Sequence, residues 1–128
     1  MPEIILDTNF ILNCIKEKID FFEELQQRGF HILIADEIIK ELEKIKKSKQ
    51  KLHFRQDADI ALKLIYKFLE EQFVRKIKIG GKDYVDKLII DFLRKNPDIY
   101  LGTMDKLIKT NLRNRKIVLR ARKKLDIV

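Results

Sequence analysis

Short aliphatic runs alternate along the chain with longer segments in which apolar residues recur every three or four positions. The short runs predict strands over residues 3–6, 30–35, 73–79, 99–102, 117–119 and 125–128. The periodic segments predict helices over residues 10–27, 38–45, 58–69, 85–93 and 104–112. The first helix is expected to break near Lys18. Strands that alternate with helices in this way indicate a parallel sheet with helices on both faces.

Polar residues suggest where these elements begin and end. Asp36 is placed to be the N-cap of the second helix, and Asp57 or Asp59 to start the third. Residues 46–56, KKSKQKLHFRQ, form either the end of the second helix or a basic loop. The chain shows no repeat and no linker, so residues 1–128 are predicted to form one α/β domain, a three-layer α/β/α sandwich around a mostly parallel sheet.

Acidic residues follow several of the predicted strands. Asp7 comes directly after the buried run Ile4-Ile5-Leu6, Asp86 lies in the helix after Gly80-Gly81, and Asp105 follows the strand that ends near Gly102. Ligand sites of parallel sheets lie beyond the carboxyl ends of the strands, where these acids should converge. Each acid alone is explained as a helix cap or surface residue. Together they would repel one another unless a hard cation such as Mg²⁺ or Mn²⁺ bound there.

The net positive charge of the chain indicates a class of binding partner. Lys and Arg total 28 against 20 Asp and Glu, a net charge of +8 that favours a polyanion such as nucleic acid, or serves solubility alone. His31 and His53 form no zinc motif, and the single Cys14 is expected in the core of a protein from a reducing cytoplasm. We expect no membrane span and no signal peptide.

Four motifs resemble the PIN-domain ribonuclease family: Leu6-Asp7-Thr8-Asn9, Ile38-Ile39-Lys40-Glu41-Leu42, Asp86-Lys87-Leu88-Ile89 and Gly102-Thr103-Met104-Asp105-Lys106-Leu107. The resemblance spans residues 3 to about 120. It implies that four acids bind the metal and are catalytic, namely Asp7, Glu41, Asp86 and Asp105. It also implies three supporting polar residues, Thr8, Asn9 and Thr103.

The sequence departs from the family pattern at two positions. Lys87 stands where some members carry another acid, a place that Asp83 would have to fill, and Met104 stands where Asn is common.

The resemblance also implies an activity, an Mg²⁺- or Mn²⁺-dependent endoribonuclease that holds one or two ions. The chain looks most similar to archaeal PIN proteins of ribosomal RNA processing. VapC-type toxins and non-cleaving RNA-binding PIN modules are the alternatives. A dehalogenase-like phosphoryl-transfer enzyme is disfavoured, because Asn9 stands where that class needs a second Asp. The expected partners are RNA, a second copy of the chain, and an antitoxin or ribosome-assembly protein.

Basic residues from two segments are the predicted RNA contacts, although a solvated surface explains them equally well. They are Lys46, Lys47, Lys49, Lys51, Arg55, Arg113, Arg115 and Arg120.

Overall fold

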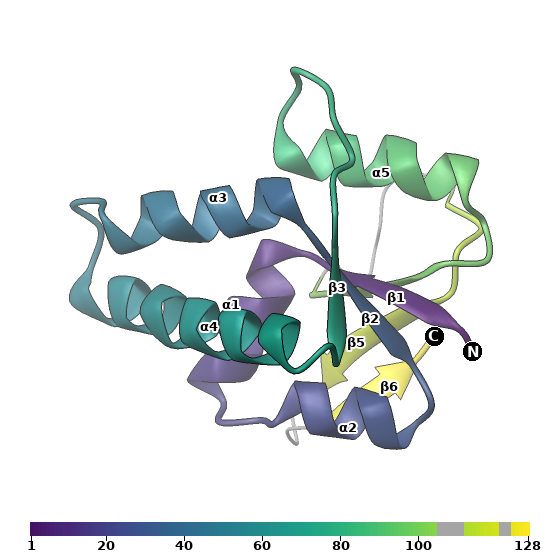
Figure 1. Ribbon diagram of the computed structural model, residues 1–128, viewed down its shortest axis with the longest axis horizontal. Helices are drawn as coiled ribbons and strands as arrows, with labels where there is room; N and C mark the ends of the chain where they lie inside the picture. Colours follow the sequence, from purple (N-terminus) through teal and green to yellow (C-terminus); the bar gives the residue numbers. More distant parts are fainter. Residues whose placement is uncertain (105–111, 121–123) are drawn as a thin grey trace.

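The computed structural model describes residues 1–104, 112–120 and 124–128. Its strands are β1 (Glu3–Leu6), β2 (His31–Ala35), β3 (Val74–Ile77), β4 (Tyr100–Thr103), β5 (Lys116–Arg120) and β6 (Lys124–Ile127). Its helices are α1 (Thr8–Lys16), α2 (Phe21–Gln27), α3 (Asp36–Lys46), α4 (Leu52–Glu70) and α5 (Val85–Lys95) (Figure 1). Within these ranges, no helix is long and apolar enough to cross a membrane.

The six strands form one sheet in the order β3-β2-β1-β4-β5-β6. All neighbouring pairs are parallel except β5 and β6. The chain moves outward from β1 to β3 and then crosses back to β4, so right-handed crossovers place α1 to α4 on one face and α5 on the other. Figure 1 shows α5 apart from the other helices across the sheet. The predicted three-layer α/β/α fold is therefore confirmed.

Strand β1 lies at the centre of the sheet and of the core. Ile4, Ile5 and Leu6 are fully buried, between β2 on one side and β4 on the other. Cys14 is buried as expected, and burial raises the pKa of its thiol to about 12, so the group stays protonated at neutral pH. The rigid, apolar strand fixes the position of whatever follows it in the chain.

Three details of the helices differ from, or refine, the sequence-based expectation. Asp36 is not an N-cap: it is the first residue of α3, where its carboxylate pairs with Lys40 at 3.1 Å and faces the positive end of the helix dipole. Helix α4 starts at Leu52 rather than at Asp57 or Asp59, so residues 52–56 of the basic segment are helical, while residues 47–51 form the turn after α3. The predicted break near Lys18 is confirmed, with Lys18 in the left-handed conformation at φ 58°.

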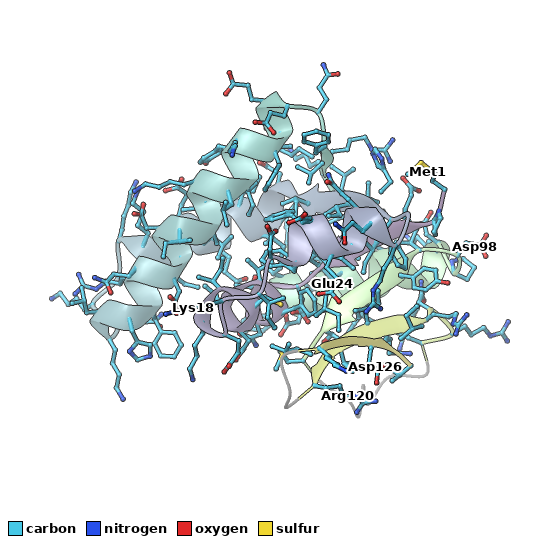
Figure 2. All side chains as sticks on the ribbon, turned by 90° about the horizontal axis from the view of Figure 1, so that it is seen from below. Met1, Lys18, Glu24, Asp98, Arg120 and Asp126 are labelled. Carbon is cyan, nitrogen blue, oxygen red and sulfur yellow. The ribbon has the colours of Figure 1, made fainter. Side chains whose placement is uncertain are left out.

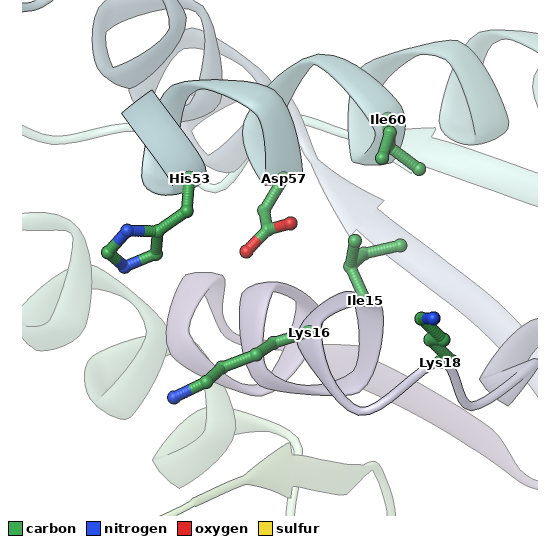
Figure 3. Close-up of a pocket in the computed structure, with 6 residues that line it drawn as sticks. All are labelled: Ile15, Lys16, Lys18, His53, Asp57 and Ile60. Atoms are coloured by element: carbon green, nitrogen blue, oxygen red, sulfur yellow. The ribbon is translucent and has the colours of Figure 1, made fainter. Parts of the chain in front are cut away.

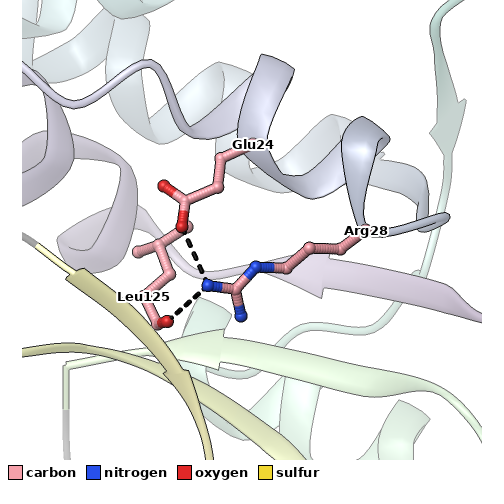
Figure 4. Close-up of polar contacts among 3 residues, drawn as sticks. All are labelled: Glu24, Arg28 and Leu125. Carbon is pink, nitrogen blue, oxygen red and sulfur yellow. Dashed lines mark hydrogen bonds and ion pairs between the residues drawn. The ribbon is translucent and has the colours of Figure 1, made fainter.

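The strands of the C-terminal part are fastened to the rest of the fold by side chains. Arg28, at the end of α2, donates from Nη2 to the backbone carbonyl of Leu125 at 2.8 Å and pairs with Glu24 at 2.9 Å (Figure 4). Arg120 of β5 pairs with Asp126 of β6 at 3.2 Å, and Figure 2 shows both at the margin of the sheet. The predicted helix over residues 104–112 falls mostly on residues 105–111, outside the described part of the chain.

Gly102 is a position where even a methyl group is too large. A Cβ there would stand 2.6 Å from Leu6 Cδ2 and 3.4 Å from the Phe10 ring, both in the buried core. We expect Gly102→Ala to lower the free energy of unfolding by about 1–3 kcal/mol through overpacking. Urea denaturation of the two proteins measures the difference. An unchanged midpoint would show that Leu6 moves aside freely, contrary to the packing described.

Candidate metal centre

Asp7 is held by backbone contacts on both sides. Its N–H donates to the carbonyl of Gly102 in β4 at 3.1 Å, and its Oδ1 accepts from the N–H of Phe10 at 2.7 Å, which makes Asp7 the N-cap of α1. The chain reverses its direction of travel across the sheet between β1 and β4, and open α/β sheets bind ligands at such a point. The carboxylate therefore stands at the position where the topology favours a site.

Two other predicted acids, Glu41 and Asp86, lie close enough to influence Asp7. Burial raises the pKa of Asp7 to about 6, and repulsion from Asp86 and Glu41 adds to this effect against the opposing hydrogen bonds. Burial also raises the pKa of Glu41, and Asp86 raises it further, while Lys44 lowers it. Helices α1, α3 and α5 thus bring three acids from distant parts of the sequence into one electrostatic cluster.

Two predicted supporting residues, Thr8 and Thr103, border this cluster. The Thr103 side chain hydrogen-bonds to Asp7 and favours its charged form. Thr8 Oγ1 is buried without a hydrogen-bond partner in the described part of the chain, yet it lies near enough to Glu41 to lower that pKa. Asn9 is exposed, and its carbonyl accepts from the Asn13 side chain at 2.8 Å.

The fourth predicted acid, Asp105, lies outside the described residues. Asp83, the candidate for a further acid, pairs with Lys87 at 3.2 Å on the exposed start of α5. In the ranges that the structure describes, no three of these carboxylates approach closely enough to form a complete ligand set. The donor chemistry still fits Mg²⁺ or Mn²⁺, which often bind one or two carboxylates and complete their shell with water and phosphate oxygens.

A family comparison agrees with this fold. The PIN-like domain family matches residues 4–124, nearly the whole chain. The chain belongs to the PIN-like domain family. The predicted resemblance is therefore confirmed.

Individual relatives point the same way. Ribonuclease VapC4 of Methanocaldococcus jannaschii is 29% identical over 134 residues, covering 99% of this chain and 97% of that protein. The PIN domain endonuclease Utp24 has a similar structure, with a TM-score of 0.69, 24% identity, and coverage of 98% and 95% of the two chains. The structure of VapBC2 of Rickettsia felis bound to promoter DNA is also similar, with a TM-score of 0.58 and 15% identity. The match covers 89% of this chain and 98% of that chain. The two structures show the PIN-like fold alone.

Glu37 is a residue of this PIN-like domain whose role the sequence did not reveal. Its carboxylate accepts from the N–H groups of Ile79 at 3.2 Å and Gly80 at 3.0 Å. Burial raises its pKa, but backbone hydrogen bonds from Glu37 itself, Gly80 and Ile79 outweigh this and lower it overall. Glu37 lies one helical turn before Glu41, so α3 both carries a candidate ligand and fixes the loop after β3. Only the fold brings the two segments together.

Most of the predicted RNA contacts fall in two groups on this PIN-like domain, and Arg120 lies apart from both at the carboxyl end of β5. Lys46 ends α3 and pairs with Asp59 of α4 at 3.0 Å, while the lysines after it form the exposed turn between the two helices (Figure 1). Arg113 and Arg115 precede β5 and therefore lie at the amino ends of the parallel strands, opposite the acids. The assignment of all eight residues to RNA binding stays a prediction.

A cleft of about 740 Å³ lies between α1 and α4, away from the acids. Its lining comes from the end of α1 and the first half of α4 (Figure 3), namely Ile15, Lys16, Lys18, His53, Asp57 and Ile60. Asp7 caps the opposite end of α1, about 12 Å away along the nine-residue helix. The cleft is therefore separate from the acidic cluster.

Proposed function

We propose that this PIN-like domain is a metal-dependent endoribonuclease that hydrolyses RNA phosphodiester bonds. The observation that carries the proposal is the cluster of Asp7, Glu41 and Asp86 at the carboxyl edge of the sheet, in a chain of net charge +8. Carboxylates that raise one another's pKa are stabilised when a cation is shared among them. The relative called Ribonuclease VapC4 supports the same activity.

The roles of the residues follow from their positions. Asp7, Glu41 and Asp86 would hold one or two Mg²⁺ or Mn²⁺ ions, with Asp105 as the fourth proposed ligand. The bound metal would supply an activated water and neutralise charge on the phosphate. Thr103 would keep the Asp7 carboxylate oriented and charged through its hydrogen bond. The backbone contacts of Asp7 to β4 and α1 would keep it from moving as substrate binds.

Metal dependence tests the proposal directly. A structured RNA incubated with the purified protein should be cut in Mn²⁺ or Mg²⁺ and left intact in a chelator, because the acids alone repel the phosphate. Cleavage should return when the metal is added back after dialysis. Gel analysis of end-labelled RNA measures the rate.

A second test is the Glu41→Gln variant, which keeps the side-chain length and removes one charge from the proposed site. It should cut slowly at low metal concentration and recover in part as the metal concentration rises, because the weakened site still fills by mass action. Equal cleavage in chelator and in metal would contradict the proposal, as would a Glu41→Gln protein with the metal dependence of wild type.

For the cellular role we propose ribosomal RNA processing, on the resemblance of the sequence to archaeal processing proteins. A toxin of the VapC type, with an antitoxin partner, is the second candidate, and the likeness to Ribonuclease VapC4 over nearly the full length of both chains favours it. Two experiments separate the toxin role from the processing role: expression of the chain in a bacterial host, and depletion of the protein from its native host. Growth arrest that needs Asp7 indicates a toxin, whereas accumulation of precursor ribosomal RNA on depletion of the native protein indicates processing.

A further inference from the structure

The loop between β3 and α5 leaves a large aromatic side chain in solvent. Tyr84 is 87% exposed, although tyrosines usually bury most of the ring. The loop follows the carboxyl end of β3 and leads into the N-terminus of α5, so it lies at the edge of the sheet that carries the acids. Figure 1 shows it standing out from the body of the molecule beside α5. Tyr84 precedes Asp86 by two residues, which limits their Cα separation to about 7 Å.

The first part of this loop is fixed to two elements that carry candidate ligands, α3 and α5. Glu37 of α3 binds two N–H groups at its start, at Ile79 and Gly80. At the next residue, the Leu88 side chain of α5 packs so tightly on Gly81 that a Cβ there would clash with it, and Gly81 has φ 105°, a conformation that favours glycine. The ring of Tyr84 is therefore presented from an anchored loop rather than from a free one.

Positive charge accompanies the ring. Lys78 and Lys82 are exposed in the same loop, and Lys87 pairs with Asp83 at 3.2 Å on the first turn of α5. An aromatic ring flanked by cations is the arrangement with which proteins bind single-stranded nucleic acid, where the ring stacks on a base and the cations meet phosphates. Here it stands next to the acidic cluster.

We propose that Tyr84 stacks on an unpaired base of the RNA beside the bond to be cut, while Lys78 and Lys82 contact the flanking phosphates. This inference rests on the proposed ribonuclease function and narrows its substrate to single-stranded RNA or loops. A base inside a duplex is already stacked on both faces, so it offers no ring surface to Tyr84.

The surroundings of Tyr84 favour a base over a protein partner. An aromatic anchor in a protein interface contributes most when other contacts around it exclude water. Apart from the partly buried Val85, the residues around Tyr84 in the chain are instead exposed and charged, at Lys82, Asp83, Asp86 and Lys87. A stacked base needs only one face of the ring and tolerates water around it.

The test is RNA binding by the full chain in chelator, where the RNA stays intact. Fluorescence anisotropy with a labelled single-stranded oligonucleotide should show that Tyr84→Ala binds roughly 5- to 100-fold more weakly, whereas Tyr84→Phe, which keeps the ring, binds within about twofold of wild type. Binding to a duplex of the same sequence should be unchanged in both. Tyr66→Ala, which removes another exposed tyrosine on α4, is the matched control and should not weaken binding.

Cleavage kinetics in Mn²⁺ add a second readout. Tyr84→Ala should raise KM for single-stranded RNA with little change in kcat, because the stacked base is bound equally in the ground and transition states. The melting temperature of Tyr84→Ala should equal that of wild type, since the side chain is exposed.

Each outcome decides between the proposals. If wild type cleaves and Tyr84→Ala binds single strands as tightly as wild type, the inference is wrong, the proposed function stands, and the ring is left for a protein partner. Equal losses on single strands and duplexes would also overturn stacking. If wild type neither binds nor cleaves RNA, the proposed function itself fails.

Discussion

Asp7→Asn is expected to lower the rate of RNA cleavage by at least about 100-fold while leaving the fold intact. Groups that merely support metal ligands change activity by about 10- to 100-fold, so loss of a central ligand charge should exceed that. Asparagine still accepts a hydrogen bond as an N-cap, so the contact from Phe10 to position 7 and the start of α1 are preserved. Initial rates on an end-labelled RNA at saturating Mn²⁺ measure the loss.

The chain offers a close control for this substitution. Asp20 is the N-cap of α2, and its Oδ1 accepts from the N–H of Glu23 at 3.1 Å, but it lies outside the acidic cluster. Asp20→Asn should therefore cut RNA at the wild-type rate. If Asp7→Asn and Asp20→Asn were equally active, Asp7 would have no place in the metal centre.

The same Asp7→Asn protein is expected to be more stable than wild type at neutral pH when metal is absent. Burial raises the pKa of Asp7 from 3.8 to about 6, so the folded state binds this proton more tightly than the unfolded state does. The stability that this tighter proton binding gives to wild type is present below pH 4 and is lost as the pH rises to 6 and above. A shift of this size corresponds to about 3 kcal/mol, as an upper limit.

Urea denaturation in chelator at pH 4 and at pH 7.5 measures this effect. The difference in unfolding free energy between Asp7→Asn and wild type should be small at pH 4 and reach roughly 2–3 kcal/mol at pH 7.5. Asp20→Asn is the control for this measurement, because it removes a carboxylate from an exposed helix cap outside the acidic cluster. A gap of equal size at both pH values would mean that the buried charge is not its cause.

The strands were the part of the fold that the sequence predicted best. Residues 3–6 were expected as a strand and form β1, because an unbroken aliphatic run next to a polar residue is typical of a buried parallel strand. The start of α4 was missed. The alternative starting points, Asp57 and Asp59, are good cap residues, but the helix begins earlier, at Leu52, in a segment whose charges suggested a loop.

The position of the candidate site was predictable where the topology of the sheet determines it. Asp7, Glu41 and Asp86 follow β1, β2 and β3 in the chain, and parallel strands bring their carboxyl ends to one edge. The two hydrogen bonds from the loop after β3 to Glu37 could not be predicted. They join residues that are separated by 42 and 43 positions in the sequence, and they depend on side-chain geometry. The prediction for Asp105 stays untested, since that residue lies outside the described ranges.

The contact between Arg28 and Leu125 has a consequence for how copies of this protein can associate. It occupies a backbone carbonyl on β6, one of the two outer strands, while the other outer strand, β3, carries the exposed Arg75 and Lys76. Charged side chains and occupied carbonyls discourage strands of neighbouring molecules from adding to a sheet. If two copies of this chain pair, we therefore expect them to do so through helical surfaces rather than by joining their sheets edge to edge.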